Sequence, residues 1–232
     1  MTANWPDANI GALHHELCRG LVESGAIPSR AVLQQRLDCS SVELDQALDA
    51  LAAEHGVVLH PGSHQVWVIH PFSLAPTPFL VQSGGRTWWG NCAWCSFGVA
   101  ALAGGSCTIT TTLGAEREQV QVRVTGGELD RNDLVVHFPV PMVHAWDNVV
   151  YTCSVMLMFR DAQEVAEWSE RHGIPRGDVQ PVATVLALAR RWYGDHLRRD
   201  WRKKSIAEAR AIFDELGLTH PVWSLPIQEG RF

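Results

Sequence analysis

The chain has 232 residues, of which 46% are hydrophobic, and a formal net charge of -6 at pH 7. This length and apolar content suit one large domain, or a small domain joined to a larger one. The acidic balance argues against a general binder of nucleic acid or of anionic membranes. The longest apolar stretch, residues 93–103, is too short and too rich in Gly to span a bilayer.

The first residues and the cysteines bear on the compartment. Residues 1–7 contain no basic segment followed by an apolar one, so we expect no signal peptide. Six Cys without such a signal indicate reduced thiols that are available for chemistry or metal binding. We therefore expect a cytoplasmic protein with no membrane partner.

Residues 10–70 have the pattern of a compact helical unit that ends in a hairpin. Apolar residues at helical spacing and Ser or Pro at the starts predict three helices, and two apolar runs around a Pro-Gly-Ser turn predict two strands. The expected helices are Ile10–Glu23, Pro28–Leu37 and Ser40–Glu54, and the expected strands are Val57–Leu59 and Val66–Ile69. Three helices followed by a two-stranded wing predict a winged-helix-like domain over residues 1–75.

The third helix of this unit is the one that would enter a DNA groove. It carries four acidic residues and neither Lys nor Arg, so phosphates would repel it. We interpret residues 1–75 as a structural domain that does not bind nucleic acid.

Residues 71–78 hold three Pro without periodicity and are predicted to be a linker. The rest, 76–232, is predicted to be an α+β thiol-site domain with an antiparallel sheet and packed helices. Its expected helices are Cys92–Ala103 with Asn91 as N-cap, Ala162–Arg171, Val182–Trp192 and Ser205–Leu216, and its expected strands are Ser106–Leu113, Gln119–Val124, Leu134–Val140 and Val149–Phe159.

Three cysteines carry most of the chemical information. Cys92 and Cys95 share one face of the first turn of their predicted helix, where the helix dipole favours a negative charge, so Cys92 is predicted to be a thiolate. Cys153 falls in a segment that is predicted to be a buried strand. Each could instead be a small buried hydrophobe, as free Cys often is.

The stretch Cys92–Gly104 resembles the active-site helix of the organomercurial (alkylmercury) lyase family, which reads Cys-Ala-x-Asp-Thr, then apolar residues, then Pro-Ala-Leu-x-Gly. Cys92 matches the first catalytic Cys of the family, and Ala101, Leu102 and Gly104 match the Ala-Leu-x-Gly. The second catalytic Cys of the family starts an apolar, aromatic-ended strand, which is followed after a short gap by a helix with Trp. Cys153, Met158–Phe159 and Trp168 follow that layout.

The sequence departs from the family at the catalytic Asp, whose position here is Cys95. An alternative register places Cys95 on the family's Cys and Gly98 on its Asp, but it spoils the later Ala-Leu-x-Gly match. In both registers the Asp is absent, which makes this an atypical member.

The resemblance implies capture of an organomercurial by thiolates and protonolysis of its carbon–mercury bond, with small thiols as co-substrate and no required cofactor. Cys92 would capture the mercury, Cys153 would co-ligate it, and Cys95 would replace the acid. One alternative is a protein that binds a soft metal ion (Hg, Cu or Zn) in a site made of Cys92, Cys95 and Cys153. A second is a lyase-fold enzyme recruited to another thiol-based reaction in small-molecule metabolism.

The remaining candidates have weaker patterns. Cys107 is interpreted as core, and Cys18 and Cys39 as structural residues of the N-terminal unit. His144 and Asp147 would form an acid–base pair, although such loop residues are more often solvated. The basic residues between 190 and 204 are interpreted as a solvated helix face, because Asp195 and Asp200 interrupt them.

Overall fold

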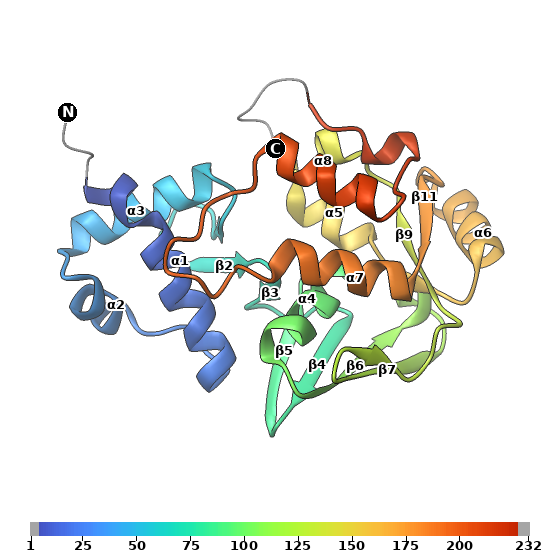
Figure 1. Cartoon of the computed structure of the whole chain (residues 1–232), viewed down its shortest axis with the longest axis horizontal. Coiled ribbons are helices and arrows are strands. Elements are labelled where there is room, and N and C mark those ends of the chain that lie inside the picture. The colour runs from blue at the N-terminus through green and yellow to red at the C-terminus, as the bar shows by residue number, and fades with distance from the viewer. Residues whose placement is uncertain (1–4, 227–232) are drawn as a thin grey trace.

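The computed structural model describes residues 5–226, with side chains from residue 9 onward; Met1–Asn4, within the segment examined for a signal peptide, lie outside it. A helical unit formed by the start of the chain lies at one end of the molecule, and the sheets with their covering helices form the rest (Figure 1). The α+β prediction is confirmed. Within residues 5–226, no helix combines the length and apolarity needed to cross a bilayer.

The N-terminal unit has the predicted order of elements. Ser29 and Ser40 cap the second and third helices through their side chains, and Glu43 completes a capping box with Ser40. The leucines of these helices are buried against one another. The elements are α1 (Trp5–Ser24), α2 (Arg30–Leu37), α3 (Ser41–Ala53) and the antiparallel strands β1 (Val58–Leu59) and β2 (Val66–Ile69).

An antiparallel sheet runs through the centre of the molecule in the strand order β1-β2-β3-β5-β4-β6-β7-β8. Residues 71–78, the predicted linker, contain β3, which pairs with both β2 and β5 and so carries the sheet from the N-terminal unit into the rest. The division into domains 1–75 and 76–232 stays a prediction. The further strands of this sheet are β3 (Phe72–Ser73), β4 (Phe79–Ser83), β5 (Arg86–Gly90), β6 (Ser106–Thr112), β7 (Gln119–Thr125) and β8 (Glu128–Leu129).

A second sheet has the order β10-β9-β11, from β9 (Val135–Phe138), β10 (Met158–Phe159) and β11 (Asp178–Pro181). The predicted strand over residues 149–159 is wrong for most of its length, because its first part is the helix α5 (Val149–Val155). Asn148 caps this helix by accepting a hydrogen bond from the Tyr151 amide, and the Thr152 hydroxyl donates to the Ala145 carbonyl. These local bonds override the β propensity of the segment.

The helix α4 (Ala93–Ala103) is the central element of the larger part. It is apolar on every side and nearly all of its residues are buried, as expected for a helix enclosed on both faces. It contacts strands β3–β6 and, opposite them, α7. The other helices are α6 (Ala162–His172), α7 (Val182–Tyr193) and α8 (Ile206–Glu215), with short 3₁₀ turns at Leu113–Ala115, Met142–His144 and Pro221–Trp223.

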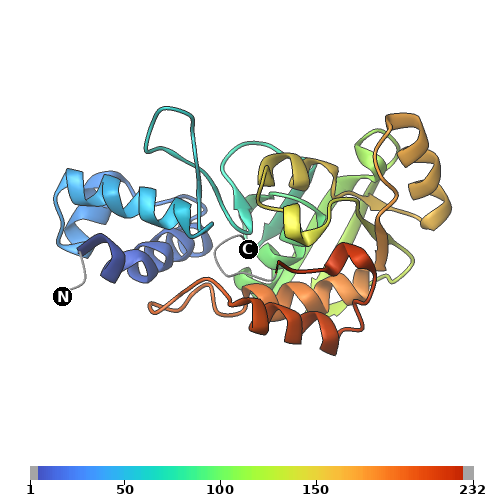
Figure 2. The ribbon, with the colours of Figure 1, turned by 90° about the horizontal axis from the view of Figure 1, so that it is seen from above.

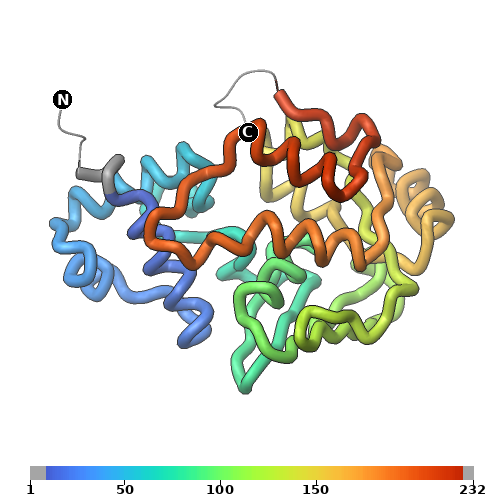
Figure 3. The backbone as a smooth tube through the Cα atoms, in the orientation of Figure 1, coloured from blue at the N-terminus to red at the C-terminus, as the bar shows by residue number. Residues whose placement is uncertain are grey.

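The segment after α7 returns to the helical unit before α8 begins, and Figures 2 and 3 show it extending toward the first helices. The indole of Trp201 stacks on the ring of His14, with centroids 3.8 Å apart. Nδ1 of His15 lies 2.8 Å from the Leu197 carbonyl oxygen. On the sheet side, the Trp88 indole donates to the Leu21 carbonyl. These contacts hold the helical unit against the rest.

Candidate active site

Cys92 and Cys95 lie at the N-terminus of α4. Cys92 itself is the N-cap, and its Sγ accepts a hydrogen bond from the Cys95 amide at 3.3 Å. The prediction that Asn91 caps this helix was wrong, because the thiol of Cys92 takes the place of a capping oxygen. Both thiols are about 1% exposed. A helix N-terminus therefore directs its unpaired amides at a buried sulfur.

Cys153 reaches the same place from near the end of α5. The Ala93 amide, at the first position of α4, donates to the Met156 carbonyl at 3.0 Å, and this bond joins the two segments. The thiol of Cys92 lies 3.5 Å from Sδ of Met156. The thiol of Cys153 interacts with those of both Cys92 and Cys95. The structure thus brings together the three cysteines that were singled out in the sequence.

Two further residues contact this thiol cluster (Cys92, Cys95 and Cys153). Nδ1 of His70, which directly follows β2, lies 3.7 Å from Sγ of Cys95, and the Tyr193 hydroxyl lies 3.4 Å from the same sulfur. Ring-nitrogen and sulfur atoms of His70, Cys95 and Cys153 all lie within 4.8 Å of one another. No spacing in the sequence links either residue to the cysteines, so sequence reasoning missed both.

The three thiols differ in acidity. Burial disfavours the Cys95 thiolate, but hydrogen bonds from the two neighbouring thiols and from His70 outweigh it and hold the pKa of Cys95 well below the usual value. Burial and the contacts with Cys153 and Cys95 raise the pKa of Cys92. Hydrogen bonding to Cys92 lowers the pKa of Cys153, but its contact with Cys95 and its burial outweigh this and raise it.

Cys95 is therefore the most acidic thiol of the cluster, and the surroundings of Cys92 and Cys153 favour their protonated forms. The sequence predicted that Cys92 carries the negative charge. The structure favours Cys95 instead, because only Cys95 receives contacts from both His70 and Tyr193. Burial and the charge on the nearby sulfur raise the pKa of Tyr193, so its hydroxyl keeps its proton and can donate to the thiolate.

The cluster lines a cavity of about 80 Å³ whose walls are mostly apolar. This is several times the roughly 10–15 Å³ that one water molecule needs. The side chains of Met142, Val149 and Met156 and four tryptophans supply the apolar surface: Trp94, Trp146, Trp192 and Trp201. A soft electrophile with an organic substituent suits this combination of sulfur donors and apolar walls.

The other cysteines and the pair His144–Asp147 lie away from the cavity. Cys107 and Cys18 are buried in the core, and Cys39 is half-buried in the N-terminal unit. His144 and Asp147 form an exposed pair, with Nδ1 and Oδ2 2.8 Å apart, that does not line the cavity. This agrees with the solvated alternative for that pair.

A solved structure described as the mercury-bound form of MerB2 superposes with a TM-score of 0.61 at 16% identity, over 83% of this chain and 98% of that one. This likeness is one of fold. No curated protein matches the chain. The model of the MerB alkylmercury lyase family matches residues 72–194, more than half of the chain and the part that contains the whole thiol cluster, so the chain belongs to the alkylmercury lyase family.

Proposed function

We propose that this protein is an organomercurial lyase that captures R–Hg⁺ with thiolates and cleaves its carbon–mercury bond by protonolysis. The observation that carries the proposal is the convergence of Cys92, Cys95 and Cys153 in one apolar cavity of a chain from this family. Small thiols would act as co-substrate, and no cofactor is required. A cytoplasmic location and the absence of nucleic-acid binding stay predictions.

In the first step, the Cys95 thiolate bonds to mercury. Cys95 suits this role better than Cys92, to which the sequence assigned it, because the pKa of Cys95 is lowered while that of Cys92 is raised. The thiolate is the nucleophilic form of Cys and the form that soft metals bind. The organic group would then face the aromatic walls.

In the second step, a neighbouring neutral thiol supplies the proton. As the Cys153 sulfur bonds to mercury, its proton passes to the substrate carbon, and the electron pair of the carbon–mercury bond forms the new C–H bond. The products are R–H and Hg²⁺ held by two thiolates, so charge and atoms balance. The raised pKa of Cys153 keeps this proton on the thiol at neutral pH, so the step does not need the family's Asp as the acid.

The test is incubation with a phenylmercury salt and excess thiol, with benzene measured in the headspace. We expect benzene from the unchanged protein and a loss of roughly 100-fold or more in C95S and C153S. Cys39→Ser, a half-buried cysteine in the other unit, is the matched control and should retain the rate. Retention of phenylmercury without benzene would refute the lyase proposal.

A second candidate function, binding of a soft metal ion, draws support from the donor set of His70, Cys95 and Cys153. Imidazole and thiolate together suit Zn²⁺ and Cu⁺, and thiolates suit Hg²⁺. This set differs from the predicted three-Cys site because His70 takes the place of Cys92. Metal analysis of the purified protein tests it: about one ion per chain supports resident metal, and none supports mercury as substrate alone.

A further inference from the structure

One wall of the cavity comes from the helical unit, which the chemistry of the thiol cluster does not use. Glu54, His55 and Gly56 line the cavity directly after α3. The helix ends in a Schellman motif, in which the His55 amide donates to the Ala52 carbonyl at 3.0 Å. The Gly56 amide donates to the Leu51 carbonyl at 2.8 Å. His55 has a φ of 60°, at a position of the motif where Gly is usual. An imidazole ring therefore lies where the backbone alone favours no side chain.

Trp146 joins this wall to the thiol cluster. The ring of His55 stacks on Trp146, with centroids 4.6 Å apart and an angle of 8° between the planes. Trp146 also meets the ring of His70 at 5.2 Å, with the planes nearly perpendicular. Nδ1 of the same His70 lies 3.7 Å from Sγ of Cys95. The half-buried Trp146 is thus held between a ring of the helical unit and a ring that contacts the reactive sulfur.

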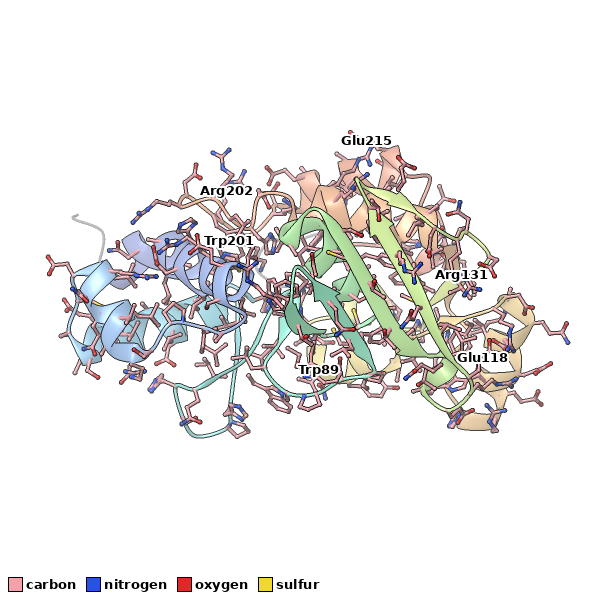
Figure 4. All side chains as sticks on the ribbon, turned by 90° about the horizontal axis from the view of Figure 1, so that it is seen from below. Trp89, Glu118, Arg131, Trp201, Arg202 and Glu215 are labelled. Carbon is pink, nitrogen blue, oxygen red and sulfur yellow. The ribbon has the colours of Figure 1, made fainter. Side chains whose placement is uncertain are left out.

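The cavity has further aromatic walls. Four of the ten tryptophans of the chain line it, and they come from separate segments: Trp94 from α4, Trp146 from the turn before α5, Trp192 from α7 and Trp201 from the stretch before α8. Figure 4 shows Trp201 beside the helical unit. Trp94 meets Trp192 edge to face at 5.2 Å. Aromatic rings attract one another in edge-to-face and offset arrangements beyond the effect of buried area. These walls therefore favour an aromatic group over an alkyl group of similar size.

Polar atoms on the wall rings add an independent observation. Nε1 of Trp94, Nδ1 of His55 and Nε2 of His70 are buried and have no hydrogen-bond partner within residues 9–226. All three rings line the cavity. Buried polar atoms of this kind are rare unless a ligand or water satisfies them. The indole nitrogen of Trp94 can only donate, and the face of an aryl group accepts weakly from an N–H whereas a methyl group does not.

We propose that arylmercury compounds are the preferred substrates and that Trp146 selects them, with His55 as the positioning residue behind it. This rests on the proposed function, in which Cys95 bonds to the mercury of R–Hg⁺. The aryl group packs against Trp146 while the mercury is on the sulfur, and a methyl group makes little contact with the rings. The exposed residues Glu54 and Arg202 line the cavity, so it is open and a larger group extends toward the solvent.

The experiment measures the second-order rate constants for capture of phenyl-, cyclohexyl- and methylmercury chloride, by stopped-flow absorbance of the new mercury–sulfur bond. The Cys95 thiolate bonds to mercury, and chloride leaves with the electron pair of the broken bond, so capture does not require carbon–mercury cleavage. Cyclohexyl is similar to phenyl in size but has no π face. A C39S background removes the half-buried cysteine outside the site. Intrinsic differences among the three compounds cancel when each variant is compared with the unchanged site.

Trp146→Ala should lower the ratio of the phenyl to the methyl rate constant roughly tenfold, because aromatic contact and buried area are both lost. It should also lower the phenyl-to-cyclohexyl ratio, and Trp146→Phe, which keeps a ring, should restore most of both. His55→Gly removes the stacked ring at a position whose backbone suits Gly. It should therefore lower both ratios without backbone strain, and add little in the Trp146→Ala background.

The chain offers a matched control in a second His–Trp stack. Trp67 and His60 stack with an angle of 11° between their planes, and neither lines the cavity. Trp67→Ala and His60→Gly should leave both ratios unchanged.

An unchanged phenyl-to-methyl ratio in Trp146→Ala would overturn the proposal. Equal losses for phenyl and cyclohexyl would also overturn it, because they would show selection by size alone. A lowered ratio without benzene leaves the aryl preference standing and refutes the lyase, whereas benzene with an unchanged ratio does the opposite. The absence of any mercury capture would refute both.

Discussion

The ring of Tyr193 packs against Gly98, where a Cβ would lie 2.4 Å from Cδ2 of the ring. The missing side chain lets α7 approach α4 closely and places the Tyr193 hydroxyl 3.4 Å from Sγ of Cys95. This also bears on the register of the family motif. A side chain at Gly98 would collide with the ring, whereas Cys95 points into the cluster, so the structure favours the register that places Cys95, and not Gly98, at the position of the family's Asp.

Gly98→Ala is expected to destabilise the protein by about 1–3 kcal/mol, because the added methyl group forces Tyr193 away from α4. Urea unfolding measures the change. In a Tyr193→Ala background the ring is absent and the close approach to Cβ of Pro71, at 2.8 Å, remains, so the same substitution should cost less. An equal cost in both backgrounds would show that the Gly98–Tyr193 contact does not set the helix spacing.

Titration of the thiols should reveal a single acidic sulfur. The ultraviolet absorbance of thiolate, followed against pH, is expected to show one step below the ordinary range of Cys, and C95S should remove it. Tyr193→Phe should move that step to higher pH, because the thiolate loses a hydrogen-bond donor. Persistence of the step in C95S together with its loss in C92S would return the charge to Cys92.

Metal affinity should distinguish the two donor sets. With Co²⁺ as the probe and its sulfur charge-transfer absorption as the readout, H70A, C95S and C153S should each weaken binding. The loss should exceed the roughly 10- to 100-fold that loss of a supporting contact costs, while C92S should stay within that range. The reverse ranking of H70A and C92S would favour the three-Cys site.

Stability should fall on acidification through the range set by His55. Its pKa is lowered from 6.5 to about 4, so the unfolded chain binds a proton that the folded one does not. Its contribution is therefore complete above about pH 6.5 and is lost as the pH falls toward 4. Urea unfolding across this range should be less pH-dependent in His55→Gln, while His144→Gln, an exposed control, should match the unchanged protein.

The sequence patterns predicted the helices well, because apolar periodicity and capping serines such as Ser40 are local signals. They failed where tertiary contacts, and not local signals, decide the secondary structure. Residues 149–155 read as a strand from their β-branched side chains, yet Asn148 and the packing of Cys153 make them a helix. The strands β3, β4, β5, β8 and β11 were also missed.

The sequence identified the cysteines of the site because the thiol is a reactive group that residue type alone reveals. His70 and Tyr193 were not, since only folding brings the end of β2 and the end of α7 to one sulfur. The position of the basic segment beside the cavity was likewise hidden. Its charges read as a solvated helix face, but the segment leaves α7 before Arg202 and turns toward the cavity.

The Ala93 amide and the Met156 carbonyl hold two distant stretches of main chain together without any side chain. A mercury ion shared by Cys95 and Cys153 would be a second link between the same two segments. Binding of the ion would then link α4 to α5 more firmly. Release of the ion to a small thiol would break only the metal–sulfur bonds, and the main-chain hydrogen bond would keep the two segments in place for the next turnover.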